Sequence, residues 1–168
     1  MGTRSELYGS ATVERGYVAL QSDIPVAGYQ VVANSRTMSS VAASRAEGAG
    51  TLYTPHFFVD SQGGNSVLRI LNPSSQSLQA VARFYSDSGR LLGSRLLSVP
   101  ANRLFSIDAA QILGLSEKDV KDLISGYLKL EVTEGDAHSF VGTVTFSGFR
   151  GRSETTVPLV RRDQREIV

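Results

Sequence analysis

Hydrophobic and polar residues alternate in short segments along most of the chain. In the clearest segment, residues 127–133, the apolar residues Leu128, Leu130 and Val132 are separated by polar ones. Because successive side chains of a β-strand point to opposite faces, this pattern predicts a strand with one face in a core and the other in water. Residues 78–84 repeat the pattern and predict a second strand of the same kind.

Further strands are predicted from the same alternation and from the Gly, Pro, Ser, Asn and Asp residues that separate the segments. They are residues 18–21, 26–32, 52–59, 66–71, 91–99, 104–107, 140–146 and 155–159. The pattern of residues 91–99 is irregular, which indicates a β-bulge. We therefore predict an all-β chain that forms two packed, mainly antiparallel sheets, a β-sandwich.

One segment departs from the alternation and predicts a short helix at about residues 116–125. The hydroxyl of Ser116 can accept a hydrogen bond from a free amide of a first helical turn. Val120, Leu123 and Ile124 follow at the spacing of one apolar stripe on a helix. We expect this helix to close one end of the core; a recognition helix is the alternative.

Comparison of the two halves of the chain reveals an internal repeat. Residues 16–20 (Gly-Tyr-Val-Ala-Leu) resemble residues 126–130 (Gly-Tyr-Leu-Lys-Leu), 110 positions later (126 minus 16). This period is about the size of one immunoglobulin-like sandwich. We therefore expect half-repeat strands in residues 1–50 that pack onto the main sandwich, a complete unit in residues 51–160 and a polar tail in residues 161–168. A homodimer through the N-terminal strands stays open as an alternative.

Several turn and strand-end motifs occur in a characteristic order. They are Pro55-His56-Phe57-Phe58, Gly63-Gly64, Leu68-Arg69-Ile70-Leu71-Asn72-Pro73, Phe84-Tyr85-Ser86-Asp87-Ser88-Gly89 and Val99-Pro100-Ala101-Asn102. In this order they resemble an uncharacterised family of bacterial repeats that occur in tandem in large secreted or cell-surface proteins. The resemblance covers most of residues 51–160. It implies an immunoglobulin-like sandwich in an extracellular setting, and it brings no catalytic residues.

Composition and charge narrow the classes of function. The 168 residues are 41% hydrophobic and carry a formal net charge of +1, so no basic excess points to nucleic acid as a partner. The chain has no cysteine, which removes disulfides, thiol nucleophiles and cysteine-ligated metals. No apolar run approaches the roughly 20 residues of a membrane-spanning helix, so we expect no membrane insertion.

Residues that carry catalysis or bind metals are sparse. The two histidines, His56 and His138, are far apart in the sequence, and each is expected at a strand end or turn rather than in a metal site. No Gly-x-Ser-x-Gly motif of a serine hydrolase and no phosphate-binding Gly-x-x-x-x-Gly-Lys motif occurs. We therefore expect neither an enzyme nor a bound metal or cofactor.

The sequence thus predicts a non-catalytic structural, spacer or adhesive module of a bacterial extracellular or cell-surface protein, whose partners are neighbouring repeats or other surface proteins. The alternative is a carbohydrate-binding or protein-ligand-binding module. Tyr17, Tyr29 and Tyr53 are the candidate ligand contacts, since aromatic residues are concentrated in the first 60 positions. Aromatic residues at alternating strand positions are more often part of a core, and we favour that interpretation.

Overall fold

The fold is built almost entirely of antiparallel strands. The computed structural model describes residues 21–24, 29–33, 38–42, 50–116, 119–137, 140–148 and 153–161. Within these ranges every strand pairing is antiparallel, and the one helix is α2 (Ala109–Leu113). The predicted all-β sandwich with one short helix is therefore confirmed.

The strands from β3 onward coincide closely with the predicted segments. The strands are β1 (Tyr29–Ala33), β2 (Met38–Ala42), β3 (Thr51–Val59), β4 (Asn65–Asn72), β5 (Leu78–Tyr85), β6 (Leu91–Val99), β7 (Arg103–Asp108), β8 (Ile124–Glu134), β9 (Val141–Gly148) and β10 (Ser153–Pro158). The bulge indicated within residues 91–99 is present, because Phe84 pairs with Gly93 whereas Tyr85 pairs with Leu91.

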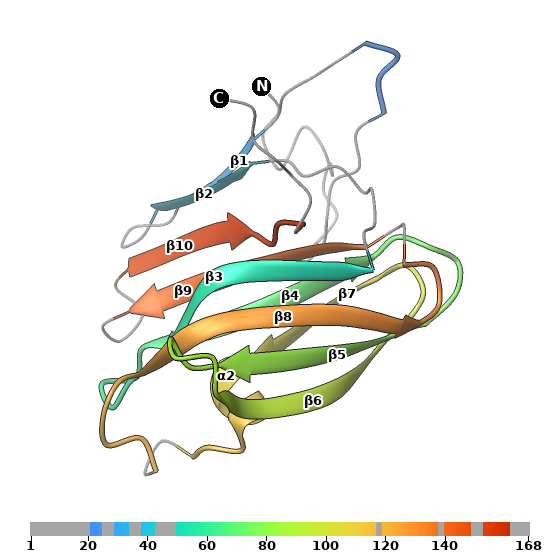
Figure 1. The fold of residues 1–168 in the computed structure, drawn as a ribbon. Helices are drawn as coiled ribbons and strands as arrows, with labels where there is room; N and C mark the ends of the chain where they lie inside the picture. The colour runs from blue at the N-terminus through green and yellow to red at the C-terminus, as the bar shows by residue number, and fades with distance from the viewer. Residues whose placement is uncertain are drawn as a thin grey trace.

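The strands form two layers that are joined at one corner (Figure 1). One layer has the order β10-β9-β4-β7, and the other has the order β3-β8-β5-β6. β4 pairs with β9 along one edge and with β7 along the other. Its pairing with β3 is therefore limited to Val59 and Asn65, beside the turn that joins the two strands. We call the layers the β4 sheet and the β8 sheet.

The core lies between the inner faces of the two sheets. Every second residue of β4 and of β5 is buried, as their alternation predicts. Phe84, Leu128 and Leu130, which the alternation places in the core, are at most 1% exposed, and Ile70 on β4 is 0% exposed. Val132 is only half-buried, because it lies near the end of β8 and packs against the rim of the core.

The helix occupies a different place from the one predicted. α2 ends at Gly114, whose φ of 69° is the left-handed conformation that glycine adopts without strain. Ala109 and Ile112 are buried, and α2 contacts strands of both sheets. It thus closes one end of the sandwich, the role expected for the predicted helix. No helix in the described ranges has the length and hydropathy needed to span a membrane.

The prediction of a helix at residues 116–125 is wrong. Ser116, the residue expected to cap it, forms an isolated turn with Asp119 instead. The Asp119 carboxylate accepts hydrogen bonds from the backbone N–H and the hydroxyl of Ser116, and the Asp119 N–H donates to the Ser116 carbonyl. The same groups would cap a helix, but here they close a single turn. Leu123 is 64% exposed, so no buried apolar stripe continues, and β8 begins at Ile124.

The N-terminal hairpin forms a separate two-stranded sheet. β1 and β2 pair with each other, and β2 lies beside β10 at the edge of the β4 sheet (Figure 1). β1 covers the end of the predicted strand 26–32, whereas residues 18–20 lie outside the described ranges. The N-terminal copy of the internal repeat, residues 16–20, also lies outside them. The division into a half-repeat, a complete unit and a tail therefore stays a prediction.

Burial of Leu130 predicts a large effect of a charge at this position. The side chain is 0% exposed, so Leu130→Asp places an uncompensated carboxylate in the core and should lower the free energy of unfolding by roughly 3–5 kcal/mol. Thr133→Asp, on the exposed part of the same strand, loses only the 3.4 Å hydrogen bond from the Thr133 hydroxyl to the Gln79 carbonyl and should lower the free energy of unfolding by at most about 1 kcal/mol. Urea denaturation measures both. Equal stability of the two variants would contradict the assignment of the inner face.

Gly126 predicts a second effect on stability, caused by the backbone. It has a φ of 155°, and a Cβ atom at this position would overlap the carbonyl oxygen of Tyr85. Gly126→Ala must therefore displace β5 from β8 and lower the melting temperature strongly. Gly89→Ala is the control, because Gly89 has a φ of 84° but a Cβ atom added to it would meet no other atom within 4 Å. The control should lower the free energy of unfolding by only about 1–2 kcal/mol. If both variants lost comparable stability, the close approach of Gly126 to the Tyr85 carbonyl would be contradicted.

Candidate functional site

The outward surface of the β8 sheet gathers aromatic, charged and exposed apolar side chains. They occupy the strand positions that alternate with the core positions, and no element of the described ranges crosses them (Figure 1). We call this surface the outer face. It includes Tyr53, Val81, Arg83, Tyr85, Leu91, Leu96, Tyr127, Lys129, Glu131 and Val160.

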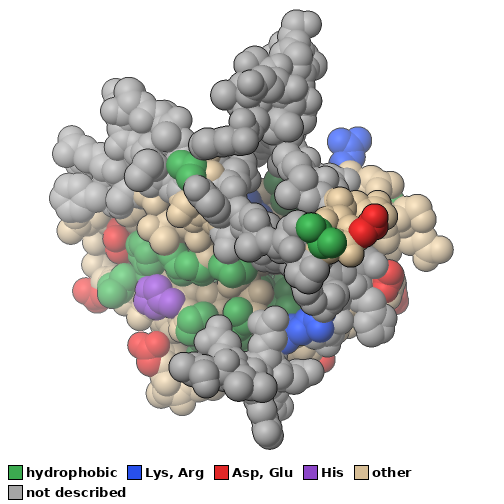
Figure 2. Space-filling model, turned by 90° about the horizontal axis from the view of Figure 1, so that it is seen from above, with side chains coloured by type: hydrophobic (Ala, Val, Ile, Leu, Met, Phe, Trp, Pro, Cys, Tyr) green, Lys and Arg blue, Asp and Glu red, His purple; other side chains and the backbone are tan. Residues whose placement is uncertain are grey.

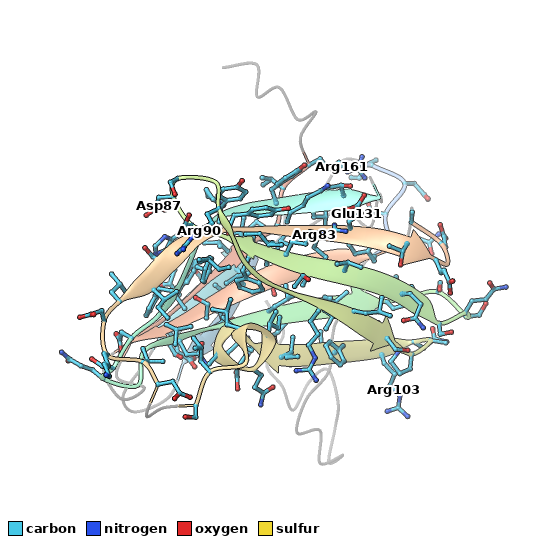
Figure 3. The ribbon with its side chains drawn as sticks, turned by 60° about the horizontal axis from the view of Figure 1, so that its bottom comes forward. Arg83, Asp87, Arg90, Arg103, Glu131 and Arg161 are labelled. Atoms are coloured by element: carbon cyan, nitrogen blue, oxygen red, sulfur yellow. The ribbon has the colours of Figure 1, made fainter. Side chains whose placement is uncertain are left out.

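Three charged side chains lie at the centre of the outer face. Arg83 on β5 pairs directly with Lys129 on β8, and both side chains reach Glu131. The Arg83 Nη1 group donates a hydrogen bond to Glu131 Oε2, and Lys129 Nζ lies 3.2 Å from the same oxygen (Figure 3). These two hydrogen bonds lower the pKa of the Glu131 carboxyl below its ordinary value of 4.5. We call the three residues the charged triad; one carboxylate is shared by two cations.

Tyrosine rings lie next to the charged triad. Tyr85 and Tyr127 are opposite each other on β5 and β8, and their rings stack with centroids 5.0 Å apart and an interplanar angle of 12°. Tyr53 on β3 pairs with Lys129 and so shares their face. All three side chains are half-buried. Cross-strand aromatic pairs stabilise a sheet, and the exposed parts of the rings are also suited to contact with a partner.

Aliphatic side chains surround the same region and are more exposed than a water-facing sheet requires. Leu96 is 64% exposed, Leu91 is 51% exposed and Val160 is 43% exposed. Leu96 pairs with the half-buried Val81, and Val160 forms an isolated bridge with Tyr53 at the free edge of β3. The exposed aliphatic side chains thus lie at the two edges of the outer face, with the charged triad between them.

Among the predicted ligand contacts, the structure places only Tyr53 at this site. Tyr17 lies outside the described residues. Tyr29 lies on β1, but its side chain is outside the described part of the chain. Sequence reasoning missed Tyr85 and Tyr127, although the alternation of their strands had already placed them opposite the core positions. The missing information was the register that brings β5 and β8 together.

A second aromatic group lies where β3 approaches β9. The ring centroids of His56, Phe58 and Phe146 lie 5.6–6.0 Å from one another. His56 follows the irregularity in β3 between Thr54 and Phe57 and is exposed. Seen from above, a histidine lies within a patch of hydrophobic side chains on this face (Figure 2). The rings cover the open side between the sheets, which is a packing role.

The described residues hold no group of three or more His, Cys, Asp or Glu side chains that could bind a metal ion. His56 contacts two phenylalanine rings, and His138 lies outside the described ranges. The charged triad provides hydrogen-bond donors and one acceptor on an open surface. Such groups are typical of the contacts between protein surfaces.

Comparisons with known proteins inform the fold alone. No protein-family model matches the chain, and no curated protein matches it. A solved structure described as the crystal structure of Thermotoga maritima 1070 is similar, with a TM-score of 0.52 and 9% sequence identity. The similarity covers 67% of this chain and 93% of the Thermotoga chain. At this identity the match supports the sandwich architecture and assigns no activity.

The lowered pKa of Glu131 predicts how the charged triad responds to pH. Folding favours the ionised carboxylate, so the stabilisation is fully present above the ordinary pKa of 4.5 and is lost as the pH falls through the lower pKa of the folded state. Because the Arg83–Glu131 ion pair is partly exposed, Glu131→Gln should lower the free energy of unfolding by only about 0.2–1 kcal/mol at pH 7. Urea denaturation at each pH measures the difference in the free energy of unfolding between this variant and the unaltered chain. This difference should shrink as the pH falls below 4.5.

Glu134→Gln is the matched control for this experiment. Glu134 is exposed at the end of the same strand, and within the described residues it makes no ion pair. Its substitution removes no ion pair of the described residues and should change the free energy of unfolding at pH 7 by less than about 0.5 kcal/mol. If Glu131→Gln and Glu134→Gln behaved alike, the triad would contribute nothing to folding.

Proposed function

We propose that this chain is a non-catalytic structural or adhesive module of a bacterial extracellular protein. The observation that carries the proposal is the use of the buried polar side chains. In the described ranges these are Thr54, Ser66, Asn72 and Thr145. All four are bound to backbone or to neighbouring strands, so these groups serve the fold. One other buried side-chain atom of the described residues, Arg161 Nη2, has no hydrogen-bond partner.

Three of these side chains, those of Thr54, Ser66 and Asn72, stabilise places where a strand bends or ends. The Thr54 hydroxyl donates to the His56 carbonyl at the irregularity in β3, and Ser66 Oγ accepts from the Phe58 N–H across the β3–β4 corner. Asn72 Nδ2 donates to the carbonyl of Val99, which ties the end of β4 to the end of β6. A buried polar group without such a partner would be a candidate for binding or catalysis.

Thr145 completes the set on the β4 sheet. Its hydroxyl accepts a hydrogen bond from Arg69 Nη1 at 2.6 Å and shares another with Thr156 Oγ1 at 2.9 Å. The three side chains come from adjacent strands β4, β9 and β10, so the hydrogen bonds run across the sheet. This arrangement holds three strands in register and leaves the function to the surface.

The alternative, a carbohydrate-binding or protein-ligand-binding module, is supported by the outer face. Half-buried tyrosine and exposed leucine side chains on the face of the charged triad favour a binding surface over an inert spacer. Adhesion and ligand binding by this face are both compatible with a non-catalytic module. The extracellular setting rests on the resemblance of the turn motifs to secreted bacterial repeats.

The proposal predicts that the protein is accessible on intact cells. An antibody raised against the chain should lose its signal when intact cells carrying the native gene are treated with protease, while a cytosolic marker stays intact. Protection of the chain until the cells are lysed would contradict an extracellular module. The experiment does not depend on any ligand being identified.

A further inference from the structure

We infer that the free edge of β10 is the surface on which this unit contacts a neighbouring repeat, and that it takes the hairpin formed by the last two strands of that repeat. The inference rests on the structural role proposed above and on the internal repeat. β9 pairs with one edge of β10, and no strand of the described ranges pairs with the other edge. β2 of the N-terminal hairpin lies beside that edge (Figure 1).

The N-terminal hairpin is the counterpart of the β9–β10 hairpin. Both hairpins are antiparallel, and each has a connection of four residues, 34–37 in the first and 149–152 in the second. The two connections are 115 positions apart (149 minus 34). The repeated segments 16–20 and 126–130 are 110 positions apart and precede their hairpins in the same order. β2 therefore corresponds to β10 in the preceding repeat.

The contact beside β10 thus brings two strands of the same kind edge to edge. β2 uses one edge for β1, and β10 uses one edge for β9, so the two remaining edges face each other. Each complete unit has a single β10 strand with one such edge. This contact therefore joins units in twos and leaves no free β10 edge for a third unit.

The β8 sheet protects its β6 edge against such pairing. β6 has a bulge opposite Phe84 and Tyr85, which interrupts the regular spacing of its backbone groups. Arg95 pairs with the buried Ala82 and therefore starts from the inner side of the edge, where its guanidinium donates to the Gln111 carbonyl of α2. Bulges and inward-directed charges are the devices that keep edge strands from pairing with other chains.

The edge of β10 lacks these devices. Its ladder with β9 has no register shift, and its one proline is its last residue. The N–H of Leu159, directly after β10, donates to the Gly142 carbonyl of β9. Because alternate residues of an antiparallel strand bond to the same neighbour, the N–H groups of Glu154 and Thr156 face the free edge. A regular edge with such donors is a surface to which another strand can be added.

Sedimentation equilibrium of the full chain, from about 10 μM to 1 mM, tests the inference. In the unaltered chain β2 covers the β10 edge, so we expect a monomer. Ser40→Pro combined with Val41→Pro removes N–H groups from both edges of β2, because neighbouring residues direct theirs to opposite sides. The uncovered β10 edge should then pair with β10 of a second chain, the counterpart of β2, and form dimers. Ser40→Ala with Val41→Ala keeps the N–H groups and should stay monomeric.

Glu154→Pro locates the contact when it is added to the two prolines of β2. It removes an N–H group from the free edge of β10 and keeps the ladder with β9, so it should raise the dissociation constant of the dimer at least about tenfold. Glu154→Ala is the matched control, because it changes the same side chain and keeps the N–H group. It should leave the dissociation constant unchanged.

Cross-linking tests the position of the hairpin without disturbing it. The chain has no cysteine, so Ser40→Cys on β2 and Thr155→Cys on β10 introduce a single pair at exposed positions. A short bis-maleimide should link the two within one chain. Ser40→Cys with Ser98→Cys, at an exposed position of β6, is the control pair and should not be linked.

Four outcomes would overturn the inference. Absence of the link between positions 40 and 155 means that the hairpin does not cover β10. A double-proline chain that stays monomeric has no strand-accepting edge at β10, and one that forms species larger than dimers does not join in twos. A dimer that responds equally to Glu154→Pro and Glu154→Ala forms elsewhere. None of these results depends on where the protein resides, so failure of the extracellular proposal and failure of this inference are distinguishable.

Discussion

The architecture depends on the fact that β4 uses both of its backbone edges within one sheet. β9 pairs along one edge and β7 along the other, so β3 can pair with β4 only at Val59 and Asn65. The chain must turn away at this corner and begin a second layer. Asp60 stabilises the turn, because its carboxylate accepts hydrogen bonds from the backbone N–H groups of Gln62 and Gly64. The core and the outer face both follow from this separation into two layers.

Alternation of apolar and polar residues is sufficient to predict the strands, because the apolar residues of a half-buried strand all lie on the face that packs against the core. β4 and β5 have strict alternation, and their buried positions are the ones that the sequence indicates. The helix could not be placed in the same way. The hydrogen bonds of Ser116 and Asp119 are also those of a helix cap, so the local signal fits two structures. Burial of Ile112 between the sheets decides in favour of α2, and burial is not visible in the sequence.

The candidate site is harder to predict than the fold. Its side chains come from separate strands and lie together only because of the register in which β5 and β8 pair. Arg83 and Glu131 are 48 positions apart, and Tyr85 meets Tyr127 only because β5 and β8 are neighbours. From the sequence alone, these residues are simply the water-facing positions of two separate strands. The concentration of aromatic residues near the N-terminus therefore pointed to Tyr53 and not to the stacked pair. Strand order, which sequence alternation does not encode, determines where the site forms.

The faces and the edges of the β8 sheet differ in the contacts that they can make with other molecules. This difference allows the outer face to carry exposed side chains while the β6 edge resists unspecific strand pairing. The inner faces form the core, and the buried side chains of Thr54, Ser66, Asn72 and Thr145 hydrogen-bond to backbone or to neighbouring strands. An exposed edge would add further strands by backbone pairing with little selectivity, but the bulge in β6 and the inward start of Arg95 oppose this. The outer face instead offers side chains, so any contact that it makes depends on the identities of residues such as Leu96 and Glu131.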